Sequence, residues 1–176
     1  LKKYDEAIVW FDKALEIASK HIPSLCNKGL TLMTLGKYDE ARDFYNKVLE
    51  IDQNNVYALS AKGQIISTQQ GKDDEAIVYF DKALEIDPKY LNALNNKAWA
   101  LVKMERYEEA LLFSEKGLVA VSNTPNNIHT MGYILLKLKQ YQDAIKWFDK
   151  ALAVDPNHKD SIKDRQLAAD AAKLDK

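Results

Sequence analysis

Length, composition and charge limit what this chain can be. With 176 residues, of which 47% are apolar and 29% charged, the chain is long enough for one ordinary folded domain. Its 25 Lys and Arg residues nearly balance its 26 Asp and Glu residues, so we expect neither nucleic acid nor an anionic membrane surface as a partner.

Cysteine usage and the chain start bear on location. Cys26 is the single cysteine, so an internal disulfide is impossible and we expect a reducing compartment, the cytoplasm. The longest uncharged stretch, residues 117–136, contains too many polar residues to span a bilayer. The chain begins at Leu1 without an initiator Met or a signal peptide, so we expect Leu1 to be an artificial or processing boundary.

One phrase recurs along the chain. It reads DEAIVWFDKALEI at 5–17, DEAIVYFDKALEI at 74–86 and DAIKWFDKALAV at 143–154, with looser copies at 39–51 and 108–121. The aligned alanines are separated by 34, 35, 34 and 34 residues: Ala7, Ala41, Ala76, Ala110 and Ala144. A fixed period of this size predicts a stacked array of small units.

Each period contains two helical patterns. In residues 22–55, Leu25, Gly29 and Leu32 fall on one face of a first helix. After a break at Gly36, a second helix repeats the same spacing with Ala41, Tyr45 and Val48. In two other copies, Asp-Pro pairs predict where the second helix ends, because proline disfavours helical geometry in the residue before it: Asp87-Pro88 and Asp155-Pro156.

Small residues on the first helix, an Ala-aromatic-Ala ladder on the second and a terminal proline closely resemble the tetratricopeptide repeat family. The resemblance covers nearly the whole chain in five copies. It implies an all-α fold, a right-handed α-solenoid (superhelix) of antiparallel helix pairs with about ten helices. The expected single domain comprises a half repeat at 1–21, repeats at 22–55, 56–90, 91–124 and 125–157, and a capping helix at 158–176.

Steric complementarity explains the repeat. Small residues let the second helix approach the first, and the aromatic residue of the ladder fills the gap. We therefore expect truncation of Phe80 or Phe148 to Ala to cost about 3–5 kcal/mol. The small positions are Gly29, Gly63, Ala98 and Gly132.

Two repeats depart from the pattern. The repeat at 56–90 has one extra residue near Gly71, where we expect a longer loop without a break in the stack. The repeat at 91–124 has Ser114 and Gly117 where an aromatic residue and an alanine belong, so its second helix is expected to be the weakest.

The two ends of the array also differ. The half repeat lacks a first helix, so its second helix is expected to leave apolar surface uncovered and to favour self-association. At the other end we expect a polar capping helix, with Ile162, Gln166 and Ala169 in first-helix positions. The uncovered surface is expected to include parts of Ile8, Phe11 and Leu15.

The resemblance implies that the first helices line a concave groove that receives an extended peptide or a partner helix. Aromatic and amide side chains at those positions suit peptide binding, although Trp99 and Tyr133 could instead simply pack between successive first helices. The expected groove residues are Tyr57, Ser60, Gln64, Asn92, Asn95, Asn96, Trp99, Asn126, His129 and Tyr133.

The charges at the expected groove positions exclude some classes of ligand. The carboxylate clamp of chaperone-binding family members requires cations at positions that here hold uncharged residues, so we do not expect it. Three recurring lysines are expected to cover apolar surface with their alkyl chains rather than to bind anions: Lys28, Lys62 and Lys97.

The sequence does not favour catalysis. The three histidines, His21, His129 and His158, lie in different repeats without metal-ligand spacing, and no phosphate-binding loop is present, so no cofactor is expected. The leading hypothesis is a non-catalytic scaffold that binds a protein or peptide partner. The alternatives are a self-assembling segment of a longer array and a substrate-docking module of a larger enzyme.

Overall fold

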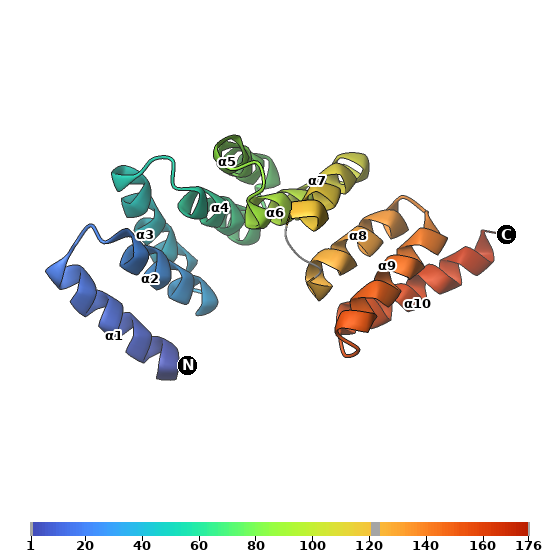
Figure 1. Ribbon diagram of the computed structural model, residues 1–176, viewed down its shortest axis with the longest axis horizontal. Coiled ribbons are helices and arrows are strands. Elements are labelled where there is room, and N and C mark those ends of the chain that lie inside the picture. The colour runs from blue at the N-terminus through green and yellow to red at the C-terminus, as the bar shows by residue number, and fades with distance from the viewer. Residues whose placement is uncertain (1, 121–123, 176) are drawn as a thin grey trace. The chain divides into compact units, whose positions relative to one another are not determined.

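The structure is a computed structural model that describes residues 2–120 and 124–175 (Figure 1). These ranges contain ten α-helices, one π-helical turn and no β-strand, which confirms the all-α prediction. The helices group into two compact units, Leu1–Pro88 and Lys89–Lys176, which are described separately.

The first unit is built from helix pairs around an apolar core. Within it, α2 packs extensively against α3, and α4 against α5. Leu25, Leu32 and Ile65 from the first helices meet Tyr45 and Val48 of α3, and all five side chains are almost fully buried. Its elements are α1 (Lys2–Ile17), α2 (Ile22–Thr34), α3 (Tyr38–Ile51), α4 (Val56–Ile65), the π-helix η1 (Ile66–Gln70) and α5 (Asp73–Ile86).

The second unit repeats the same arrangement and adds a final helix. Here α6 pairs with α7, and α9 lies against both α8 and α10 (Figure 1). Met131 and Leu135 of α8, Ala144 and Phe148 of α9 and Ala168 of α10 form one buried cluster. The elements are α6 (Leu91–Lys103), α7 (Tyr107–Ala120), α8 (Pro125–Lys137), α9 (Tyr141–Val154) and α10 (Lys159–Leu174).

Helix ends follow local chemistry. The α5 and α9 helices end at Ile86 and Val154, directly before the two Asp-Pro pairs, as predicted. The turns between paired helices each contain one residue with left-handed backbone geometry. These residues are Gly36, Gly71, Glu105 and Lys139, with φ values of 75°, 63°, 59° and 60°. In the turns at Gly36, Glu105 and Lys139, amide groups bond back to carbonyl groups of the preceding helix.

The extra residue of the repeat at 56–90 is accommodated differently from our expectation. Instead of a longer loop, the end of the first helix widens into η1, whose wider turns take up an additional residue. Ile65 and Ile66 are both buried, so the widening keeps two successive apolar side chains in the core. Asp73 holds the position that Tyr38, Tyr107 and Tyr141 hold in other repeats, and it accepts a hydrogen bond from Ser67 of η1.

The two terminal helices agree only in part with expectation. On α1, Ile8, Phe11 and Leu15 are half-buried, so parts of these side chains stay uncovered as expected. Trp10 and Ile17, which were not expected, are 67% and 89% exposed. On α10 the buried face contains Ser161, Asp164 and Ala168. Ile162, expected in a first-helix core position, is 51% exposed, because the described chain supplies no second helix that would cover it.

Candidate functional site

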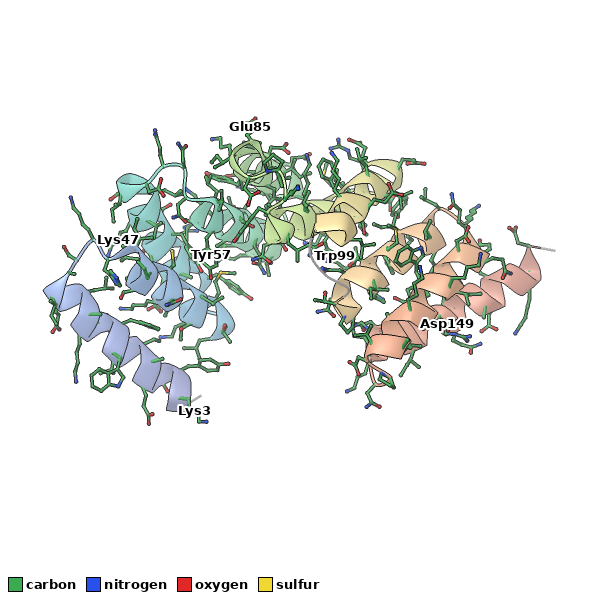
Figure 2. The ribbon with its side chains drawn as sticks, in the orientation of Figure 1. Lys3, Lys47, Tyr57, Glu85, Trp99 and Asp149 are labelled. Carbon is green, nitrogen blue, oxygen red and sulfur yellow. The ribbon has the colours of Figure 1, made fainter. Side chains whose placement is uncertain are left out.

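Two large aromatic side chains meet on the first helices of the second unit. The rings of Trp99 on α6 and Tyr133 on α8 lie 5.6 Å apart between centroids, at an interplanar angle of 52°. Figure 2 labels Trp99 on its helix. This contact is the packing between successive first helices that the sequence left open, and peptide binding by the pair stays a prediction. Trp99 nevertheless remains 41% exposed, so the contact leaves much of its indole ring available.

A third apolar residue continues this arrangement on α10. Leu167 holds the position on α10 that Trp99 and Tyr133 hold on α6 and α8, and it is 55% exposed. We call Trp99, Tyr133 and Leu167 the apolar row. Leu167 was not among the residues predicted from the sequence. Its five-residue separation from Ile162 equals that of Tyr133 from Ile128, and this spacing could have identified it.

Polar residues of different chemistry lie at the two ends of these helices. Near the helix starts, Asn92 on α6 and Asn126 on α8 are exposed amides, and Asn96 is half-buried. At the helix ends, Lys103 and Lys137 are exposed cations. The Nζ atom of Lys137 lies 5.3 Å from the centroid of the Tyr133 ring.

His129, an expected groove residue, is buried behind Tyr133. Its Nε2 atom lies 3.0 Å from Oδ2 of Asp164 on α10, and its ring centroid is 6.1 Å from that of Tyr133 and 5.5 Å from that of Phe148. Both members of the His129–Asp164 pair are buried. His129 therefore joins α8 to α10 through Asp164, and its ring packs against the ring of Tyr133.

Asn126 is held by His158, the residue that caps the start of α10. The backbone N–H of Ser161 donates to Nδ1 of His158, which caps the helix at 3.2 Å. Because Nδ1 accepts this bond, the neutral imidazole carries its proton on Nε2, which donates to Oδ1 of Asn126 at 2.8 Å. The Asn126 amide group is thereby oriented, and its Nδ2 remains a possible donor to a ligand.

Asn95, another expected groove residue, is directed into the helix interface. Its Nδ2 donates to Oδ1 of Asn127 on α8 at 2.8 Å, and its Oδ1 lies 2.9 Å from where a Cβ on Gly117 would be. Gly117 thus makes room for the Asn95 amide. Nδ2 of Asn127 is buried without a hydrogen-bond partner among the described residues.

The expected groove residues of the first unit lie on α4. Tyr57 is half-buried, with its ring centroid 6.0 Å from that of Tyr45. Burial raises the pKa of the Tyr57 phenol, and its hydrogen bond with Tyr45 opposes part of that shift. Ser60 is 2% exposed and its hydroxyl has no partner among the described residues, whereas Gln64 is exposed.

The recurring first-helix lysines place their ammonium groups over aromatic rings, and coverage of apolar surface by their alkyl chains stays a prediction. The Nζ atoms of Lys28, Lys62 and Lys97 lie 4.4, 5.0 and 3.9 Å from the ring centroids of their partners. Lys28 also pairs with Asp12 of α1 and so links α1 to α3. The three ring partners are Phe44, Tyr79 and Phe113.

The described part of the chain holds no cluster of three or more His, Cys, Asp or Glu side chains that could bind a metal ion. Across residues 2–120 and 124–175, every helix is too short or too polar to span a bilayer.

Comparisons with known proteins agree with the repeated helix pairs. Sequence profiles described as Tetratricopeptide repeat match residues 22–55 and residues 1–21. A profile described as Anaphase-promoting complex, cyclosome, subunit 3 matches residues 69–151. A search of curated proteins gave no match.

Solved structures of similar fold are numerous. The APC/C hetero-tetramer Cut9-Hcn1 superimposes with a TM-score of 0.87 at 21% identity, over 95% of this chain and 33% of that chain. A thermophilic tetratricopeptide repeat protein of Thermus thermophilus gives 0.79 at 17% identity, over 96% and 92%. YrrB, described as a tetratricopeptide repeat protein with an unusual peptide-binding site, gives 0.72 at 22% identity, over 93% and 84%.

These identities establish likeness of fold alone. The repeat profiles agree with the period of the sequence and with the close approach of small residues and rings in each helix pair. The chain belongs to the tetratricopeptide repeat family.

Proposed function

We propose that this chain is a non-catalytic scaffold that binds an extended segment of a partner protein on the apolar row. Tetratricopeptide arrays are protein-interaction scaffolds, and the similar structure YrrB is described by its peptide-binding site. The observation that carries the proposal is the 41% exposure of Trp99 beside Tyr133. Aromatic side chains that remain accessible next to a rigid partner are frequent energetic centres of protein interfaces.

The amides beside the row support an extended ligand. The exposed side chain of Asn92 offers a donor and an acceptor, and that of Asn126 offers its Nδ2 donor, which suit the N–H and C=O groups of a peptide backbone. The hydrogen bond from His158 fixes the orientation of the Asn126 amide before any ligand arrives. This reduces the side-chain entropy that binding costs. Tyr57 and Gln64 of the first unit remain predicted contacts.

Selection from a random peptide library on the immobilised full chain tests the proposal. We expect recovered peptides to contain a bulky apolar residue and to lose affinity about tenfold or more with Trp99→Ala. Leu167→Ala is expected to weaken binding as well. Leu112→Ala is the matched control, because Leu112 on α7 is 49% exposed but lies outside the row. Peptides that bind the Trp99→Ala variant as well as the unmodified chain would show that the row is not the site.

Self-association through α1 is a second candidate function. Trp10 and Ile17 are 67% and 89% exposed, which is unusual for side chains of this size on one helix. We expect sedimentation velocity at increasing concentration to show a dimer or larger species that Trp10→Lys weakens. A monomer at every concentration excludes this candidate and leaves peptide binding unaffected.

A further inference from the structure

We infer that a hollow between the start of α8 and the end of α9 binds a small molecule that joins an aromatic or branched apolar group to an acidic group. The hollow has a volume of about 330 Å³. It shares no residue with the apolar row, so the inference does not depend on the proposed function. Among the described residues, the hollow is lined by Ile128, Trp147, Lys150, Ala153 and Val154.

The walls of the hollow are mainly apolar. Ile128 is buried, and Trp147 is half-buried because it packs against the cluster that contains Met131 and Phe148. Val154 is 52% exposed and supplies a branched side chain at the end of α9. Ligand pockets commonly have volumes of about 300–1,000 Å³ and apolar walls with few polar groups. The hollow is therefore suited to a small ligand with one ring or one branched chain.

Ala153 makes this repeat different from three others. The aligned residue in the second helices α1, α3 and α5 is a glutamate: Glu16, Glu50 and Glu85. Each of these glutamates follows a lysine by three residues, a spacing that brings opposite charges together on a helix. At the same spacing after Lys150 stands Ala153, which has neither the length nor the charge of glutamate. The replacement leaves both the space and the Lys150 ammonium group open to a ligand.

Met131 is a second difference in the same helix pair. In three other pairs, two ammonium groups lie near one ring, the first from a first-helix lysine and the second from a second-helix lysine. The residue of α8 that aligns with those first-helix lysines is Met131, which is buried. Trp147 is therefore approached by Lys150, whose Nζ atom lies 3.8 Å from the ring centroid, and by no lysine from α8. A neutral thioether in the place of an ammonium group keeps this side of the indole apolar.

The charge of the hollow is complementary to an acid. Lys150 is the one charged residue among its described lining residues. Nearby carboxylates of α9 have partners elsewhere, because Asp149 pairs with Arg165 of α10 and Asp143 with Lys146. A cation beside apolar walls attracts an anion more strongly than a fully hydrated cation does, because the local dielectric constant is lower. An acidic group on the ligand would therefore lie at Lys150, with its apolar group against Ile128 and Val154.

A purely structural explanation makes a different prediction. If the hollow were only the space that Ala153 leaves, it would not distinguish an acid from an uncharged molecule of the same size. Probes matched in size and different in charge therefore separate the two explanations. A glutamate at position 153 should be tolerated by the fold, because the same residue stands at that position in three other repeats.

Fluorine NMR on the full chain tests the inference with two probes, 4-(trifluoromethyl)benzoate and the uncharged 4-(trifluoromethyl)benzamide. We expect saturable broadening of the benzoate signal and binding of the benzamide that is weaker by about threefold or more. Lys150→Gln should remove this preference. Ala153→Gln should weaken both probes by filling the space, and Ala153→Glu should weaken the benzoate about tenfold or more, because it also adds a like charge.

Lys116→Gln is the matched control, because Lys116 lies 5.0 Å from the Phe113 ring on α7 and holds the position of Lys150 outside the hollow. It should leave the binding of both probes unchanged. Circular dichroism of each variant checks that the helices are retained.

The outcomes decide the inference independently of peptide binding. Benzoate binding that Ala153→Glu leaves unchanged, or the absence of saturable binding, overturns the inference. Equal binding of benzoate and benzamide assigns the hollow to apolar packing and also overturns it. Benzoate binding that depends on Ala153 and Lys150 supports it, and Trp99-dependent peptides should bind the Ala153→Glu variant as well as the unmodified chain.

Discussion

A Cβ atom on Gly132 of α8 would lie 2.7 Å from Cε1 of Phe148 on α9, so this helix pair closes only because residue 132 has no side chain. Gly63 and Phe80 have the same relationship, also at 2.7 Å. In the pair formed by α6 and α7, the glycine position holds Ala98, and Ser114 replaces the ring. The sizes of the two facing residues are therefore matched within each pair.

This matching predicts non-additive stability. Gly132→Ala should lower the free energy of unfolding by about 1–3 kcal/mol through overpacking, and Phe148→Ala by about 3–5 kcal/mol. The double variant Gly132→Ala with Phe148→Ser reproduces the Ala98–Ser114 pair of α6 and α7. Its loss of unfolding free energy should be smaller than the summed losses of Gly132→Ala and Phe148→Ser. Urea denaturation followed by circular dichroism measures all of them. Val154→Ala, at a side chain 52% exposed on α9, is a control expected to change stability by less than about 0.5 kcal/mol. Strict additivity would contradict the matching.

Gly117 is a second glycine whose missing side chain leaves room for a contact, here the Asn95 amide. In the Asn95→Ala background, Gly117→Ala should raise the free energy of unfolding by about 1 kcal/mol, because alanine favours the helix. In the unmodified chain the gain should be smaller or reversed, because the new Cβ displaces the Asn95 amide from its bond to Asn127. A double-mutant cycle in urea measures the coupling, and equal gains in both backgrounds would show that Gly117 does not serve Asn95.

The turn before α9 contains backbone strain at Lys139 that a substitution should relieve. Lys139 has a φ of 60°, a left-handed conformation that is unfavourable for a residue with a side chain. Lys139→Gly should therefore raise the unfolding free energy by about 0.5–1 kcal/mol, after the entropic cost of glycine is subtracted. Gly36→Ala tests the same principle in reverse and should destabilise the turn before α3. Thermal denaturation of both variants measures the two effects, and a drop in stability for Lys139→Gly would refute the strain.

The buried His129–Asp164 pair should hold α10 in place. Replacing His129 with Ala leaves the Asp164 carboxylate buried without its partner, which should cost about 3 kcal/mol or more. Asp164→Asn retains a hydrogen-bonding oxygen and should cost less. Hydrogen exchange by mass spectrometry should show the loss of protection concentrated in α8 and α10. Uniform loss across the second unit would mean that the pair supports the whole unit rather than the docking of α10.

Cys26 should react slowly with alkylating reagents. Burial raises the pKa of its thiol, so at any pH near neutrality the folded chain contains less of the reactive thiolate than an ordinary exposed cysteine would. Iodoacetamide labelling, followed by intact mass, should therefore be slow at neutral pH and accelerate as the pH is raised beyond the usual range for cysteine. The same chain in urea is the control, and equal rates in both states would contradict the burial of the thiol.

The fold was largely predictable because its packing repeats. A ring needs a small residue opposite it in each helix pair, so Gly29, Gly63 and Gly132 recur with the ladder residues Tyr45, Phe80 and Phe148 at one period. The widened η1 segment was not predictable, because a loop and a π-helix both absorb one extra residue. Burial of both Ile65 and Ile66 favours the second.

The sequence predicted the positions of the candidate site residues better than the directions of their side chains. The period identified which first-helix residues share a position, and the contact between Trp99 and Tyr133 agrees with it. The inward direction of Asn95 and His129 depends on Asn127 and Asp164, which lie 32 and 35 residues away along the chain.

The sequence alone therefore determined the all-α class, the pairing of helices and the helix boundaries set by Asp-Pro pairs, because local propensity and a repeating steric fit are both written in residue order. Only the tertiary structure showed which polar side chains are used internally and which face solvent. A buried amide or imidazole needs a partner, and that partner stands on a neighbouring helix whose distance in space is not encoded by spacing in the chain.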